Sequence, residues 1–118
     1  MNFFLLGLFI VLLSSPVSAQ PLPFEGRWAQ QAAWCDPAAR PADGLPPIVL
    51  TRRKLDAGMM TCDLTSVKPD GATYRAEANC VVTQTKERGR ELFGFRRVED
   101  ILHWSWGDRT VTFHRCPK

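Results

Sequence analysis

The sequence predicts an all-β domain, a small antiparallel up-and-down barrel of about seven or eight strands stapled by disulfide bonds. From Ile48 onward, short segments of alternating apolar and polar residues are separated by turn signals, and no long helical period interrupts them. Four cysteines are spread along a chain of 118 residues, a length that suits one domain. A closed barrel is expected because closure removes exposed sheet edges.

The beginning of the chain predicts a cleaved secretory signal. An apolar run over residues 3–13 is followed by Pro16 and by the small residues, ending at Ala19, that a signal peptidase recognises. The run is too short to span a bilayer as a helix, which takes about 20 residues. We therefore expect residues 1–19 to be a signal peptide and residues 20–118 to form a single barrel domain. The mature protein would be periplasmic or secreted, monomeric and without a membrane span.

The first part of the mature chain is rich in proline. Residues 20–24 form a short leader that two prolines stiffen toward an extended conformation. A first strand is expected over residues 25–29. Residues 35–47 contain four prolines and predict a long loop, within which residues 36–40 could form one helical turn.

The rest of the chain alternates between strands and turns. The predicted strands are 48–52, 59–67, 73–85, 90–98, 101–106 and 110–116. The predicted turns are 56–58, 68–71, 86–89 and the hairpin loop 107–108. In the last hairpin, alternation predicts these core residues: Leu102, Trp104, Trp106, Val111 and Phe113.

The cysteines predict two disulfide bonds. Four cysteines in a small exported chain are typical of a disulfide framework, and their wide spacing disfavours a zinc site. Three pairings are possible in principle. We favour the nested one, Cys35 with Cys116 and Cys62 with Cys80, because Cys35 and Cys116 lie near the two ends of the domain.

The inner pair of this pattern carries a register problem. If a tight loop at 68–71 set the register, Cys62 would face Glu77 rather than Cys80. The nested pairing therefore needs either a longer loop, extending to about Tyr74, or a β-bulge.

No catalytic constellation is visible. His103 and His114 alternate with inward-facing neighbours and are expected to point to solvent. Ser66 and Ser105 lack a nucleophile-elbow context, and cysteines held in disulfides supply no thiolate. The sequence predicts a non-enzymatic protein with no catalytic residues, no metal site and no cofactor.

The formal net charge of +3 leaves two interpretations of the basic residues. They could form an electropositive face for an anionic ligand, or they could be solvated side chains that protect strand edges. No motif for nucleic-acid binding is present. The anion-binding interpretation assigns a small or anionic ligand of the cell envelope to these residues: Arg52, Arg53, Arg96 and Arg97. A further alternative is a structural envelope protein without a discrete site.

Short motifs in one order carry a family resemblance. Gly26-Arg27-Trp28 resembles the G-x-W motif of lipocalin-like (calycin) barrels. Three further motifs follow along the chain. They are Cys62-Asp63-Leu64, then Asp70-Gly71 with the strand after it that ends at Cys80, and finally Val111-Thr112-Phe113. This order resembles bacterial periplasmic metalloprotease inhibitors of the Inh type, which are small eight-stranded barrels with one disulfide. The chain is also similar to small four-cysteine secreted proteins of proteobacteria.

The Inh resemblance implies an exported hydrolase as the partner and the leader as the inhibitory segment. In that family the residues before the G-x-W strand insert into the protease cleft. A stiff, proline-bearing strand loses little entropy on binding. The corresponding residues here are Gln20, Pro21, Leu22, Pro23 and Phe24. The chain departs from the family in its short leader, in its proline-rich loop at 35–47 and in its second cysteine pair.

Overall fold

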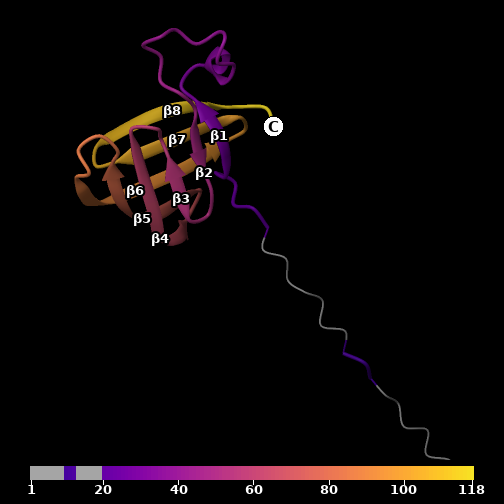
Figure 1. The fold of residues 1–118 in the computed structure, drawn as a ribbon. Coiled ribbons are helices and arrows are strands. Elements are labelled where there is room, and N and C mark those ends of the chain that lie inside the picture. The colour runs from indigo at the N-terminus through magenta and orange to yellow at the C-terminus, as the bar shows by residue number, and fades with distance from the viewer. Residues whose placement is uncertain (1–9, 13–19) are drawn as a thin grey trace, which may run out of the picture.

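The protein is an eight-stranded antiparallel barrel, as the sequence predicted (Figure 1). The computed structural model describes residues 10–12 and 20–118. Each strand pairs with the next in chain order, and the last pairs with the first. The strands are β1 (Gly26–Ala29), β2 (Ile48–Leu50), β3 (Lys54–Asp56), β4 (Met60–Asp70), β5 (Thr73–Val82), β6 (Arg88–Val98), β7 (Ile101–Trp106) and β8 (Arg109–Arg115).

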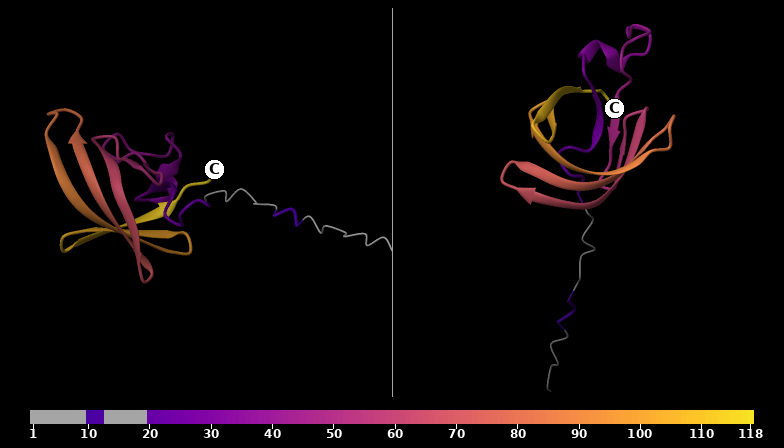
Figure 2. Two further views of the ribbon diagram at one scale, coloured as in Figure 1. Left: turned by 90° about the horizontal axis from the view of Figure 1, so that it is seen from below. Right: turned by 90° about the vertical axis from the view of Figure 1, so that its left-hand side faces the viewer.

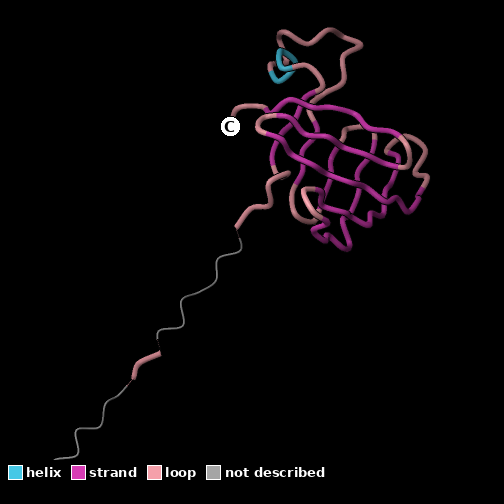
Figure 3. Tube along the Cα trace, turned by 180° about the vertical axis from the view of Figure 1, so that it is seen from behind, coloured by secondary structure: helices cyan, strands magenta, loops and turns pink. Residues whose placement is uncertain are grey.

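The signal-peptide prediction falls mainly outside the described residues, which include only 10–12 of the segment 1–19. In the part of the chain that the structure describes, no helix is long and apolar enough to cross a membrane. The one short helix there, η1 (Ala32–Cys35), is a 3-10 turn in the connection between β1 and β2. This connection stands apart from the barrel wall (Figure 3).

Aromatic side chains fill the barrel. Trp104 packs edge-on against Phe93 and lies close to Phe113, with ring centroids 5.2 and 5.9 Å apart. Leu102, Trp104 and Phe113 are buried, as the alternation of the last hairpin predicted. Trp106 and Val111, at the other end of that hairpin, are only partly buried against the core. Burial of each large apolar side chain stabilises the fold by about 1.5–3 kcal/mol.

Two disulfide bonds close the fold, and they have the nested pairing. Cys35 in η1 is bonded to Cys116 just after β8, and Cys62 in β4 is bonded to Cys80 in β5. The first bond ties the β1–β2 connection to the end of the last strand. The second joins two neighbouring strands at positions that lie directly opposite one another.

A bulge in β4 solves the register problem that the sequence raised. Asp70 lies opposite Thr73, so the turn consists of residues 71–72 and the predicted turn at 68–71 was wrong. With that turn alone, Cys62 would lie opposite residue 81. The register shifts by one between Leu64 and Ser66, which places Cys62 opposite Cys80. The extra residue of a bulge is what allows the two half-cystines to share one face.

Three local predictions need correction. The three-residue strand β3 lies where the sequence suggested a loop and a turn. The helical turn expected over 36–40 is absent, because the helical residues are Ala32–Cys35 and residues 37–39 form turns. Asp36 nevertheless caps this region, since its Oδ1 accepts a hydrogen bond from the Ala38 N–H at 2.9 Å. The boundaries of the β5–β6 hairpin also differ, with β5 ending at Val82 and β6 beginning at Arg88.

Candidate binding cleft at the leader end of the barrel

The leader folds back into the barrel and forms part of its core. Phe24 is fully buried. Its ring stacks on Phe95 at 5.0 Å and meets Tyr74 edge-on at 5.5 Å. The Trp28 indole N–H donates a hydrogen bond of 2.9 Å to the Phe24 carbonyl. The residue that ends the leader therefore acts as an apolar plug.

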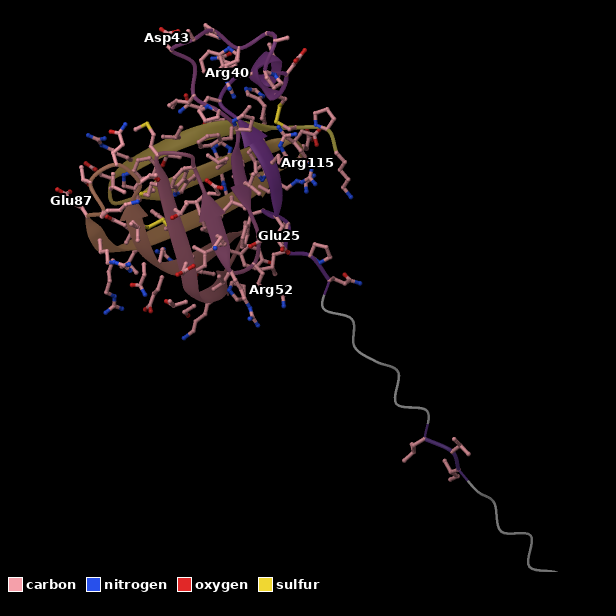
Figure 4. All side chains as sticks on the ribbon, in the orientation of Figure 1. Glu25, Arg40, Asp43, Arg52, Glu87 and Arg115 are labelled. Atoms are coloured by element: carbon pink, nitrogen blue, oxygen red, sulfur yellow. A yellow bond between two sulfur atoms is a disulfide. The ribbon has the colours of Figure 1, made fainter. Side chains whose placement is uncertain are left out.

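The main chain of the leader is fixed by arginines from distant parts of the sequence. The Arg52 guanidinium donates a hydrogen bond to the Gln20 carbonyl at 2.9 Å, and Arg97 donates to the Pro23 carbonyl at 3.2 Å. The Glu25 N–H closes a turn by donating to the Leu22 carbonyl at 3.0 Å. Figure 4 shows Arg52 beside Glu25 where the chain enters the barrel. The leader is held in one conformation rather than projecting as a free arm.

A gap in strand pairing leaves the barrel wall open beside this plug. The pairing of β3 with β4 ends at Asp63, whereas β4 continues to Asp70 with β5 as its only partner among the described strands. A cleft of about 510 Å³ lies at this opening. Its walls expose polar and apolar surface in about equal parts, and its rim carries two arginines. The main lining residues are Leu22, Leu64, Val67, Tyr74, Arg52 and Arg53.

The rim of the cleft is positively charged. Arg52 and Arg53 are exposed, and neither takes part in an ion pair within the part of the chain that the structure describes. The Glu25 carboxylate accepts hydrogen bonds from the main-chain N–H groups of Leu22 and Arg52. Glu25 therefore organises the β2–β3 turn and the leader together, and the Arg52 guanidinium keeps N–H donors besides the one bonded to the Gln20 carbonyl.

Only two of the four arginines predicted to bind an anion line this cleft. Arg97 instead lies over the Trp28 ring at 5.6 Å and is 3.7 Å from the Asp100 carboxylate. Arg115, which the sequence analysis did not single out, lies over the same ring at 5.3 Å. Arg97 and Arg115 thus pack on a buried tryptophan, which makes them structural. Arg96 is exposed and does not line the cleft.

The five leader residues predicted to bind a partner differ in how far they are exposed to solvent. Gln20, Pro21 and Pro23 are exposed, whereas Leu22 is half-buried against the core and Phe24 is fully buried. A partner protein could contact the first group directly. Phe24 could reach a partner only if it left the core.

The remaining candidates for chemistry do not come together. His103 and His114 are half-buried on β7 and β8, and Ser105 donates a 3.4 Å hydrogen bond to the Gly94 carbonyl. Over residues 10–12 and 20–118, no group of three or more His, Cys, Asp or Glu side chains could hold a metal ion. Ser66 lies at the edge of the cleft without a histidine among the lining residues.

Sequence reasoning missed the apolar walls of the cleft. Leu64, Val67 and Tyr74 were assigned to strands, and nothing in their spacing marks them as lining residues. The strand lengths explain the opening once β3 is known, because β3, the neighbour of β4, has three residues and cannot pair with all eleven residues of β4. Such a mismatch leaves part of the longer strand without a neighbour.

Together, the fold and the cleft define a small disulfide-bonded antiparallel barrel with an amphipathic opening at one end. When the chain is compared with protein-family models, with curated proteins and with solved structures, none of them matches it.

Proposed function

We propose that this protein is an exported, non-enzymatic binding protein that takes up an amphipathic anion at the leader end of its barrel. The observation that carries the proposal is the cleft of about 510 Å³ in which the side chains of Leu22, Val67 and Tyr74 lie with Arg52 and Arg53. Its volume lies within the range of about 300–1,000 Å³ that is usual for small-molecule sites. The two disulfides support export, because such bonds persist in oxidising compartments.

The chemistry of the lining suggests the class of ligand. A guanidinium group presents a planar fork of N–H donors that matches a carboxylate or phosphate. Leu22, Val67 and Tyr74 line the same cleft and are only partly buried, so they offer apolar surface to a ligand. A ligand with an anionic head and an apolar body would satisfy both parts of the cleft, whereas a purely polar anion would leave the walls uncovered.

The test is calorimetric titration of the mature protein with decanoate and, in parallel, with the corresponding neutral alcohol. Decanoate should bind more tightly than the alcohol. The double variant R52Q/R53Q should weaken decanoate binding by about tenfold or more, since it removes charge-assisted hydrogen bonds. The matched control is Arg96→Gln, which lies outside the cleft and should bind like the wild type. Equal binding by R52Q/R53Q and Arg96→Gln would refute the proposal.

A second candidate function is inhibition of an exported hydrolase through the leader. The observation that favours it is that Pro21 and Pro23 are exposed on a main chain that Arg52 and Arg97 already hold in place. A preordered segment pays less conformational entropy on binding a protease cleft. The proline-flanked peptide bonds would also resist cleavage.

This candidate needs a test that spares the core. Deleting all of residues 20–24 would remove Phe24 and confuse loss of inhibition with loss of the fold. The double variant P21G/P23G keeps Phe24 and should weaken inhibition of an exported zinc metalloprotease if the leader is inhibitory. The control P41G/P46G makes the same change in the β1–β2 connection. Absence of inhibition by the folded wild-type protein, or equal inhibition by both variants, would exclude this function.

A further inference from the structure

One strand of the barrel has a free edge far from the leader. β6 contains eleven residues, but β7 pairs only with its second half, from Phe93 to Val98. Residues 88–92 pair with β5 on one side and, among the strands that the structure describes, with none on the other. Figure 2 shows this part of the β5–β6 hairpin, in orange, standing clear of the β7–β8 hairpin. Five residues of main chain thus present an open edge.

An open edge can accept another strand. Its outward N–H and C=O groups are arranged to pair with an extended polypeptide, which would gain affinity from main-chain hydrogen bonds. Side-chain positions near one end of this stretch are also uncrowded, because a Cβ atom added at Gly89 would have no neighbour within 4 Å. A strand that pairs antiparallel with β6 here would run in the direction of β7 and continue its line.

The side chains along this edge have a definite pattern. Phe93 and Phe95 face the core, so alternation places Arg88, Arg90 and Leu92 on the outer face. Leu92 is 71% exposed. It also borders a groove of about 690 Å³ whose other lining residues include Gly94, Ser105 and Trp106. The outer face of the edge therefore presents two cations followed by an apolar contact.

The same pattern disfavours pairing with a second copy of the chain. A symmetric antiparallel pairing of two such edges would centre on Arg90, so that the two Arg90 side chains would lie directly opposite one another. Like charges in directly opposed positions destabilise a sheet. Glu77, 3.8 Å from Arg90 across an exposed ion pair, offsets this repulsion only weakly because both side chains are largely in solvent. A strand with acidic residues opposite Arg88 and Arg90 has no such penalty.

From these observations we infer that the edge of β6 over residues 88–92 is a docking site for an extended acidic peptide segment of another protein. In the antiparallel orientation the segment reads apolar-x-acidic-x-acidic. The apolar residue lies opposite Leu92 and reaches the adjoining groove, and the two acidic residues lie opposite Arg90 and Arg88. This inference is independent of the cleft at the leader end.

The test uses a blocked heptapeptide, Ser-Val-Thr-Glu-Thr-Glu-Ser, and a matched peptide in which lysine replaces both glutamates. Amide chemical shifts of the ¹⁵N-labelled mature protein are followed during titration with each peptide. The glutamate peptide should give saturable shifts concentrated at the amides of residues 88–92. The double variant R88E/R90E should weaken its binding by about tenfold and should bind the lysine peptide better than the wild type does.

A charge-matched control separates docking from general electrostatics. K54E/K118E makes the same change in net charge at two exposed residues away from the edge and should bind the glutamate peptide as the wild type does. Three outcomes would overturn the inference. They are the absence of saturable shifts, equal weakening by the control, and a free protein that sediments as a dimer until Arg90→Glu is introduced.

Discussion

Truncation of Phe24 tests whether the leader is a plug of the barrel. The side chain is fully buried, stacks on Phe95 and contacts Tyr74 edge-on. Replacement of a buried phenylalanine by alanine costs about 3–5 kcal/mol, because transfer free energy is lost and a cavity remains. A domain of this size has only about 5–15 kcal/mol of stability in total. Phe24→Ala should therefore lower the free energy of unfolding by about 4 kcal/mol.

Urea denaturation of the oxidised mature protein, followed by circular dichroism, measures this change, and thermal unfolding gives a second measure. The melting temperature should fall by about 20 °C. Gln20→Ala, in the same leader but exposed, should stay within about 0.5 kcal/mol of the wild type. If Phe24→Ala and Gln20→Ala are equally stable, the leader does not contribute to the core and our description of this end of the barrel is wrong.

Three further changes test other features of the fold, the first two by the same denaturation assay and the third by thiol titration. Replacing Cys35 and Cys116 with alanine should lower the free energy of unfolding by about 4.5 kcal/mol, and removing the β4–β5 disulfide should lower it by about 3 kcal/mol. The difference arises because the closed loops span 81 and 18 residues. The reverse order would contradict the loop-entropy argument. Gly94→Ala should lower the free energy of unfolding by about 1–3 kcal/mol, because its Cβ would lie 2.5 Å from the Ser105 Oγ. Adding Ser105→Gly to this variant should restore most of the lost stability. Deletion of Thr65 removes the extra residue of the bulge, so β4 should straighten while Cys62 stays opposite Cys80, and a thiol titration should find no free thiol. Two free thiols in the folded deletion variant would show that the bulge does not set the register.

The sequence predicted the barrel because most of its strands carry their own signal. Alternation marked β5, β7 and β8, and Gly107-Asp108 marked the hairpin between the last two. β3 was not predicted because three residues are too few for alternation to be visible, and because the predicted strand 48–52 extended into the residues that turn before β3. A strand this short is specified by its neighbours, Leu50 and Cys62, rather than by its own residues.

At the turn between β4 and β5, the register of the two strands overrides the turn preference of the local sequence. Pro69 and Gly71 favour a turn around them, and the sequence analysis placed it at 68–71. Pro69 instead lies in β4 opposite Tyr74, on the stretch of that strand that has no neighbour on its other side among the described strands. Proline is tolerated there because no ladder hydrogen bond is required of its nitrogen. The pairing of Cys62 with Cys80 and the burial of Ala76 and Ala78 outweigh the local turn signal.

The cleft could not have been predicted, because it depends on residues that only the closed barrel brings together. Leu22 and Arg52 are thirty residues apart in the sequence, yet both line it. The sequence did supply the two arginines of the rim through the basic run that begins at Arg52. It did not supply the apolar walls, since a half-buried valine or tyrosine in a strand looks the same whether it faces a cleft or a neighbouring side chain.

The leader links the two proposed functions through one end of the barrel. Leu22 lines the cleft, and two residues later Phe24 is locked in the core. Arg52 contacts both the cleft and the Gln20 carbonyl. A ligand that engages Arg52 therefore acts on the same group that orders the leader, and the free energies of the two events must be coupled reciprocally. An anion that draws Arg52 away from Gln20 would loosen the exposed prolines, so a leader that inhibits a hydrolase would do so less well when the cleft is filled.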